Sequence, residues 1–249
     1  TQGVSSAASD VYKRQHQLYT LVVTSVCISS NLYFYPFRKV GSVMLARYIA
    51  RIVFIILITL SLTYFSHILP FMTLNLILAY IPFELCFLLK LFKPHKAYEW
   101  PLFILFGLIF VLMVPNTFYM VTDMIHLNQF SFDFRSGLVL MEWAHFSFLV
   151  AGVCLALYCL CLMLLELDRF TTHVWLNRVL VVALMFLDGL GIYIGRFLRF
   201  HSVYLINEPS RIFTLVWQQF DLNAFIFILF MVLLQGLLYL FMKGVRIAK

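Results

Sequence analysis

Six long apolar runs constrain what this chain can fold into more than any other feature of its sequence. Each run is close to the roughly 20 residues that a helix needs to cross the hydrocarbon core of a bilayer. The chain is 63% hydrophobic and 12% charged, whereas soluble domains are about 45–50% apolar and about 25% charged. We therefore predict an all-α fold, a polytopic transmembrane helical bundle. The expected spans are residues 48–68, 71–91, 100–119, 138–163, 176–197 and 222–243.

The chain before residue 48 is less regular. Residues 18–36 are apolar but include three serines and an asparagine, which is typical of either a seventh span or an interfacial helix. The stretch VSSAASDVYKRQ resembles translated adapter sequence, so we expect residues 1–15 to be a non-native tail. The predicted organisation is this tail, a weakly apolar segment over 16–47 and a single transmembrane domain over 48–249.

The distribution of Lys and Arg predicts the orientation in the membrane. Connections on one side of the predicted spans hold twelve basic residues, and those on the other side hold four. Because cytoplasmic connections are enriched in Lys and Arg, the first side is predicted to be cytoplasmic, with the carboxyl terminus. Residues 116–126 and 196–202 then fall on the outer face of the cell membrane.

The charge pattern also argues against two other functions. A net charge of +7 is compatible with nucleic-acid binding, but the basic residues occur in short groups between apolar runs, so we expect no nucleic-acid partner. All five cysteines fall inside apolar runs, where thiols serve as small packing side chains. We therefore predict neither a disulfide framework nor a zinc site.

A polar cluster follows the third span, in VPNTFYMVTDMIHL. If the helix continues past Pro115, then Asn116, Tyr119, Asp123 and His126 form one narrow stripe. A stripe that contains an Asp faces protein or a polar cavity, because an Asp turned to lipid is costly. The alternative is structural, with Asn116 capping a short outer helix and Asp123 anchoring a loop to an arginine.

A second cluster ends the fifth span, in GIYIGRFLRFHS. Gly191 and Gly195 form a G-x-x-x-G pattern, which allows a partner helix to pack closely. Arg196 and Arg199 are expected at the outer interface, where a guanidinium can bind a phosphate or carboxylate in a bidentate manner. The alternative for each arginine is snorkelling to the headgroups or pairing with Asp123.

Three further polar residues lie within the predicted spans: Asn75, Glu84 and Asp188. An acid at hydrocarbon depth indicates a functional site or a hydrogen-bonded structural carboxyl. Glu84 and Asp188 on two helices would suit proton-coupled transport, although no inverted repeat is visible.

Three stretches, TLNLILAYIP, VPNTFYMVTDMIHL and GLGIYIGRFLRFHS, resemble in order and spacing an uncharacterised bacterial membrane family, domain of unknown function 1361. The resemblance covers roughly residues 48–243. It implies characteristic positions at Asn75, Pro82, Pro115, Asn116, Tyr119, Thr122, Asp123, His126, Gly191, Tyr193, Gly195, Arg196, Arg199 and Ser202. The chain departs at residues 201–204, where the sequence HSVY replaces an expected Asn-Ser-Trp-Asp run. The family implies no established activity.

The sequence offers little support for cofactor chemistry. Asp123 and His126, like Glu142 and His145, are three residues apart, but no H-E-x-x-H motif occurs. The chain has no G-x-S-x-G elbow, P-loop or dinucleotide fingerprint. We therefore expect no metal and no cofactor, and leave open whether the protein is an enzyme.

Three functions remain. In the first, Asn116, Tyr119, Asp123, His126, Arg196 and Arg199 bind an anionic headgroup of a phospholipid or a polyprenyl-linked envelope precursor. If that site is catalytic, His126 or Asp123 would be the acid or base. In the second, Asp188 and Glu84 titrate in a transporter of small solutes. In the third, the protein is a structural or assembly subunit in which Asp123 pairs with Arg199. Membrane lipids are the expected partners.

Overall fold

The computed structural model describes residues 39–65, 69–94, 96–130, 132, 137–198, 214 and 218–247. The chain divides into two compact units, Thr1–Tyr48 and Ile49–Lys249. The expected tail over 1–15 and the segment over 18–36 lie outside the described residues. The elements that follow belong to the second unit, except for the first ten residues of helix α2, which belong to the first.

Helices make up the structure, and the described part of the chain contains no strand. The long helices are α2 (Lys39–Leu60), α3 (Pro70–Leu91), α4 (Trp100–Met113), α6 (Leu140–Leu167), α7 (Val174–Arg196) and α10 (Leu222–Ile247). Shorter elements are the π-helix η1 (Ser61–Phe65), the 3₁₀ helix η2 (Ala97–Glu99), the helix α5 (Pro115–Thr122) and the 3₁₀ helix η3 (Asp123–Gln129).

Six helical segments are long and apolar enough to cross a membrane. They cover Met44–Phe65, Phe71–Leu91, Ala97–Gln129, Leu140–Leu167, Val174–Arg196 and Leu222–Arg246. The prediction of an all-α bundle with six spans is confirmed. The third segment is 33 residues long, and at about 1.5 Å per residue it exceeds a hydrocarbon core about 30 Å thick. One of its ends therefore extends beyond the hydrocarbon.

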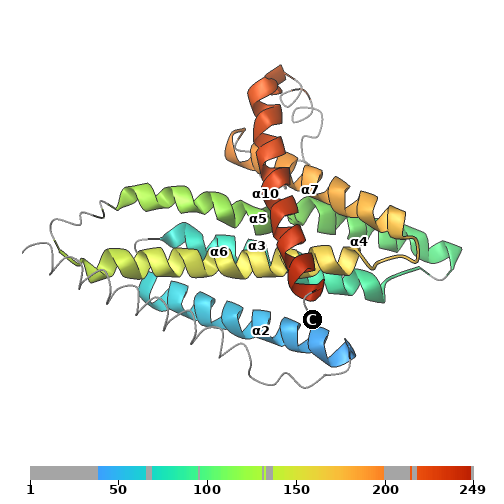
Figure 1. The fold of residues 1–249 in the computed structure, drawn as a ribbon, viewed down its shortest axis with the longest axis horizontal. Helices are drawn as coiled ribbons and strands as arrows, with labels where there is room; N and C mark the ends of the chain where they lie inside the picture. The colour runs from blue at the N-terminus through green and yellow to red at the C-terminus, as the bar shows by residue number, and fades with distance from the viewer. Residues whose placement is uncertain are drawn as a thin grey trace, which may run out of the picture. The chain divides into compact units, whose positions relative to one another are not determined.

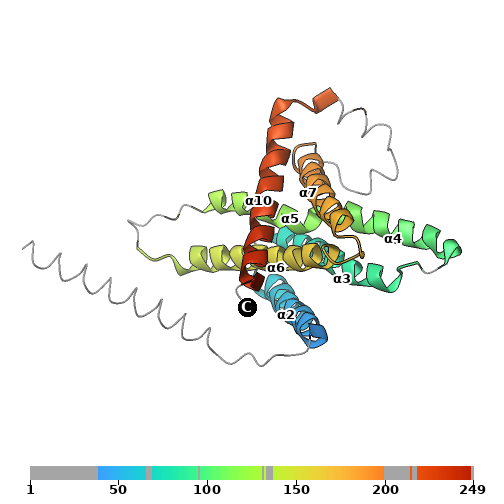
Figure 2. The same ribbon diagram turned by 45° about the vertical axis from the view of Figure 1, so that its right-hand side comes forward.

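The core of the second unit is built around α3. Helices α3, α5 and α6 lie side by side (Figures 1 and 2), and α3 also contacts α4. Met72, Leu76 and Phe83 on α3 are fully or almost fully buried, as is Phe118 on α5. Helix α10 packs against α7, where Ile228 is fully buried (Figure 1).

Proline determines how the third span is divided. Pro115 has no N–H, so it cannot continue the hydrogen-bond ladder, and it starts α5 directly after α4. The Asn116 side chain donates to the Met113 carbonyl over 3.0 Å, while the Thr117 N–H turns to the Val114 carbonyl. The chain stays helical through this break, which is the condition on which the predicted stripe depends, and it narrows to a 3₁₀ helix at Asp123.

A buried asparagine closes the turn between α6 and α7. Asn177 accepts hydrogen bonds from the Thr171 N–H and hydroxyl, over 2.9 and 2.7 Å. Its amide donates to the carbonyls of Asp168 and Thr171. Lys243 on α10 lies 3.4 Å from Asp168. The predicted cytoplasmic end of these helices is thus joined by polar contacts, none of which the sequence analysis anticipated.

Candidate functional site

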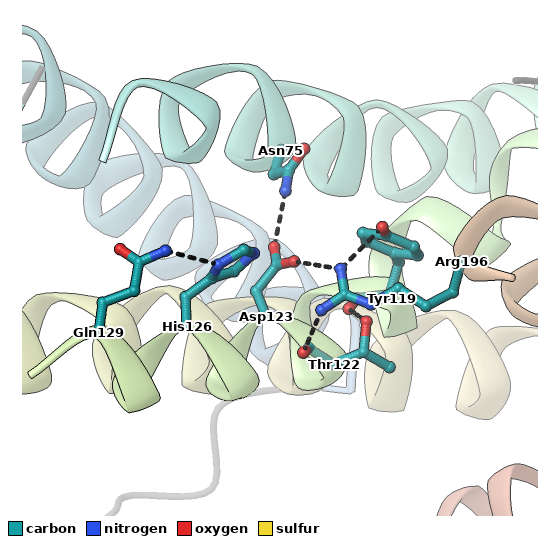
Figure 3. A network of polar contacts seen from close by, with 7 residues as sticks. All are labelled: Asn75, Tyr119, Thr122, Asp123, His126, Gln129 and Arg196. Atoms are coloured by element: carbon teal, nitrogen blue, oxygen red, sulfur yellow. Dashed lines mark hydrogen bonds and ion pairs between the residues drawn. The ribbon is translucent and has the colours of Figure 1, made fainter. Parts of the chain in front are cut away.

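The guanidinium of Arg196, at the end of α7, is the centre of a polar network (Figure 3). Its Nη1 donates to the Tyr119 hydroxyl over 2.9 Å and to Asp123 Oδ1 over 3.4 Å. Its Nη2 donates to the Thr122 carbonyl over 2.9 Å. The guanidinium also lies over the Tyr119 ring, 5.2 Å from its centroid. The end of α7 is therefore attached to the junction of α5 and η3.

Local helix geometry explains why three acceptors point to one arginine. Tyr119 and Asp123 are four residues apart, which places them on the same side of the helix. Thr122 is the last residue of α5 and the N-cap of η3, and its carbonyl oxygen has a second lone pair that can accept from Arg196. The Thr122 hydroxyl donates back to the Tyr119 carbonyl over 2.7 Å.

Asp123 is the buried acid of this network. Its side chain is fully buried, whereas that of Arg196 is 20% exposed. Asn75 on α3 donates to Asp123 Oδ2 over 2.7 Å, so each carboxylate oxygen has a partner. The pair is neutral overall, and Asp123 connects three elements, α3, η3 and α7. The sequence analysis placed Asn75 in the membrane but not beside Asp123.

His126 and Asn116, two other members of the predicted stripe, make different contacts. Side chains three residues apart lie on one side of a 3₁₀ helix, and Asp123, His126 and Gln129 follow each other in this way (Figure 3). His126 Nδ1 bonds to Gln129 Nε2 over 3.3 Å, and its ring lies against Phe71. Asn116 bonds only within its own chain segment, at Met113. Neither residue is hydrogen-bonded to Arg196 within the described structure.

Arg199 and Ser202 lie outside the described residues, so the structure does not place them. The described partner of Asp123 is Arg196 rather than the Arg199 that the structural hypothesis named. Gly191 lies one and a half turns before Arg196 and faces Pro115: a Cβ built on Gly191 would be 2.7 Å from Pro115 Cβ and closer still to its Cγ. This close approach of α7 to α5 brings Arg196 within reach of Tyr119.

Glu84 has a partner that the sequence analysis missed. Arg51 on α2 binds Glu84 on α3 in a bidentate manner, with Nε and Nη2 each 2.8 Å from a carboxylate oxygen. The Tyr80 hydroxyl donates to the same carboxylate over 2.6 Å. Arg51 lies inside the first span, and an arginine at that depth normally requires a partner. This requirement is the signal in the sequence that Arg51 pairs with an acid, and the count of basic residues for orientation does not use it.

Asp188 differs from Asp123 and Glu84, which both have hydrogen-bond partners. It is 1% exposed on α7, and neither carboxylate oxygen has a hydrogen-bond partner in the described part of the chain. Glu84 and Asp188 share no hydrogen-bond partner among the contacts above. The described residues also contain no group of three or more His, Cys, Asp or Glu side chains placed to hold a metal ion.

The chemistry of the network follows from its donors. A guanidinium has five N–H donors, and the three contacts above leave the Nε–H and one Nη2–H without a bond to any residue that the structure describes. Nε and Nη2 are adjacent nitrogens, which suit two oxygens of one phosphate or carboxylate. Asp123, being an acceptor, orients the arginine and balances its charge.

Comparison with known proteins gives one family. The family model described as Protein of unknown function (DUF1361) matches residues 74–238, which include Asn75, Tyr119, Asp123 and Arg196. No curated protein and no solved structure matches the chain.

Proposed function

The chain belongs to the family of proteins of unknown function DUF1361, and we propose that it is a multi-pass membrane protein in which Arg196 binds the phosphate of an anionic lipid headgroup. The single observation that carries the proposal is the state of the Arg196 guanidinium. The guanidinium is held by three acceptors, the side chain as a whole is 20% exposed, and two donors on adjacent nitrogens are unused by the described residues.

The neighbours of Arg196 act as positioning residues in this proposal. An arginine on a flexible stem loses side-chain entropy when it binds, whereas one already fixed loses less. Tyr119, Thr122 and Asp123 hold the guanidinium in one orientation. Asn75 in turn holds the Asp123 carboxylate. The proposed binding group is therefore Arg196, with Arg199 as the nearest further cation in sequence.

The depth of Arg196 supports a headgroup rather than a solute in the membrane interior. Arg196 is the last residue of both α7 and the fifth membrane segment, so its guanidinium is near the polar boundary of the bilayer. The excess of Lys and Arg at the opposite ends of the helices supports an outer-face position for this boundary. The proposed ligand is accordingly a phosphate group in the outer leaflet.

Two lipid classes share this chemistry, a phospholipid and a polyprenyl-linked envelope precursor. The test is native mass spectrometry of the protein in nanodiscs, with phosphatidylglycerol and a polyprenyl phosphate added in turn. Arg196→Lys keeps the charge but cannot present a planar pair of donors. Arg178→Lys, on the exposed opposite end of the same helix, is the matched control.

Under the proposal, the wild type and the Arg178→Lys variant retain one lipid at the same ratio of lipid to protein. The Arg196→Lys variant binds that lipid at least tenfold more weakly. Retention of phosphatidylglycerol or of the polyprenyl phosphate identifies the class. Equal retention in all three proteins, with Arg196→Lys still folded, overturns the proposal and assigns Arg196 to helix packing in a structural or assembly subunit.

A further inference from the structure

The carboxyl group of Asp188 is the most unusual buried group outside the Arg196 network. It lies eight residues before Arg196 on α7, about 12 Å deeper along the helix. Its exposure is 1%, and both oxygens lack a partner in the described segments. Leaving a carboxylate unpaired in such surroundings costs far more than burying a neutral acid.

Two contacts define the level of Asp188 relative to the third span. Gly191 meets Pro115, 76 positions earlier, and Arg196 meets Tyr119, 77 positions earlier. Because both contacts follow the same order along the chain, α7 runs parallel to the α4–α5 segment. Extended by one turn, the same offset of 76 to 77 positions would bring Asp188 level with Val111 and Leu112, at the end of α4. Asp188 and Gly191 are three residues apart and so share a face of α7.

The backbone at this level is interrupted. The carbonyl of Val111 would normally accept the N–H four residues later, but that residue is Pro115, which has none. At the next turn the Met113 carbonyl takes its hydrogen bond from the Asn116 side chain. Interrupted helices near the middle of a membrane provide backbone carbonyls to protons and cations in transporters.

We propose that Asp188 is a proton-binding site in the membrane interior, located at the break between α4 and α5, which takes up and releases a proton during the working cycle. A buried acid without a described partner is less costly to hold neutral than charged, so the resting form in this proposal is the protonated one. Release of the proton creates a carboxylate with no described partner, so it requires α7 to separate from the break far enough to admit water. The proposal does not depend on what Arg196 binds.

A proton fits this site better than a metal ion, because the described residues place no group of three or more His, Cys, Asp or Glu side chains around Asp188. Among the described residues, no titratable or charged group on the packed elements is hydrogen-bonded to Asp188. Helix α4 has none, and α5 has Tyr119. The others are Arg178, Tyr193 and Arg196 on α7, Glu142, His145, Cys154, Tyr158, Cys159, Cys161 and Glu166 on α6, and Tyr239, Lys243 and Arg246 on α10.

The test is infrared difference spectroscopy of the full chain in nanodiscs between low and high pH. The wild type should show the C=O stretch of a protonated carboxylic acid that disappears reversibly as pH rises. Asp188→Asn should lack this band, and Asp188→Glu should shift its frequency. Asp221→Asn, which removes an exposed acid before α10, is the matched control and should keep the band.

The asparagine side chain has the shape of a neutral aspartic acid, so Asp188→Asn should fold as the wild type does. If it does not fold, the frequency shift of Asp188→Glu still assigns the band. A band assigned to Asp188 that persists at every pH would make the residue a permanently neutral structural acid. If Asp188→Asn and Asp188→Glu give the same spectra as the wild type at all pH values, the carboxyl group of Asp188 does not titrate. Either result overturns the proposal.

Discussion

Arg196 and Tyr119 are 77 positions apart, yet Arg196 Nη1 donates to the Tyr119 hydroxyl over 2.9 Å, and the guanidinium also lies 5.2 Å from the centre of the Tyr119 ring. One tyrosine thus provides both a hydrogen-bond acceptor and an aromatic face to one arginine. A cation over an aromatic ring gains about 0.5–2 kcal/mol, with the larger values where water is excluded. This contact attaches the last residue of the fifth apolar segment to the third segment.

The Asp123–Arg196 pair should be worth much more than a surface ion pair. Arg196→Gln leaves the fully buried Asp123 with Asn75 as its one described partner, and breaking a buried pair from one side costs about 3–5 kcal/mol. Adding Asp123→Asn removes the stranded charge and should recover part of that loss. The measurement is the free energy of unfolding in micelles for both single variants and the double variant. Additive losses would contradict the coupling.

The Arg51–Glu84 pair provides the contrast. Its geometry is bidentate at 2.8 Å, but the Arg51 side chain is 41% exposed and that of Glu84 is 28% exposed. Both residues lie inside membrane segments, where polar groups also find partners in the unfolded state, so the coupling energy should be near the roughly 0.6 kcal/mol typical of polar pairs in membranes and below about 1.7 kcal/mol. A double-mutant cycle with Arg51→Gln and Glu84→Gln measures it. A coupling as large as that of Asp123 with Arg196 would show that exposure is the wrong criterion here.

Gly191→Ala should destabilise the protein and displace α7. The new Cβ would lie 2.7 Å from Pro115 Cβ, so the two helices must separate, and overpacking of this kind costs about 1–3 kcal/mol. Gly107→Ala on α4 is the control, because nothing lies within 4 Å of the position that its new Cβ would occupy. In a helix that change should be neutral or stabilise by up to about 1 kcal/mol. Thermal unfolding of both variants decides between crowding and a general effect of losing glycine.

The carboxylate of Asp221 should stabilise the folded protein at neutral pH but not in acid. The Ala224 N–H donates to Asp221 Oδ1 over 2.8 Å at the start of α10, and this bond holds the pKa of Asp221 below its usual value. A lowered pKa in the folded state means that the contribution is present above the unfolded value of about 3.9 and is lost as pH falls through the folded value.

Asp221→Asn retains a capping side chain but does not titrate. The difference in melting temperature between wild type and variant, measured at about pH 7 and again below about pH 4, should therefore shrink at the lower pH. A difference that stays constant across this range would show that the Asp221 charge does not contribute.

The two polar clusters illustrate how far the sequence could be interpreted. Their positions at the ends of the third and fifth spans follow from counting apolar residues, since a helix advances by a constant rise per residue. That Tyr119 and Asp123 share one helix face follows from periodicity. Which arginine meets them does not, because Arg196 reaches Asp123 only through the approach of Gly191 to Pro115. The G-x-x-x-G pattern predicts a close helix contact at Gly191, but nothing in the sequence specifies that Pro115 makes it.

Side-chain partners were the least predictable feature. Asn75, Glu84 and Asp188 all appear from the sequence as polar groups at membrane depth. The structure separates them: Asn75 binds Asp123, Glu84 binds Arg51, and Asp188 has no partner in the region described. Each outcome depends on which helices are neighbours, and a helix presents a similar apolar surface to lipid and to several other helices.

The sequence by itself determined that this chain is an all-α membrane protein with six spanning segments. Unpaired backbone groups are costly in lipid, and a single long apolar run can pair all of its own only by forming a helix. It also determined that the polar residues occur at span ends and at three interior positions. The tertiary structure alone decided which of them meet. Hydrogen bonds act over about 3 Å, and contacts between residues 48 to 77 positions apart, such as Asn75 with Asp123 and Tyr119 with Arg196, depend on how the helices pack.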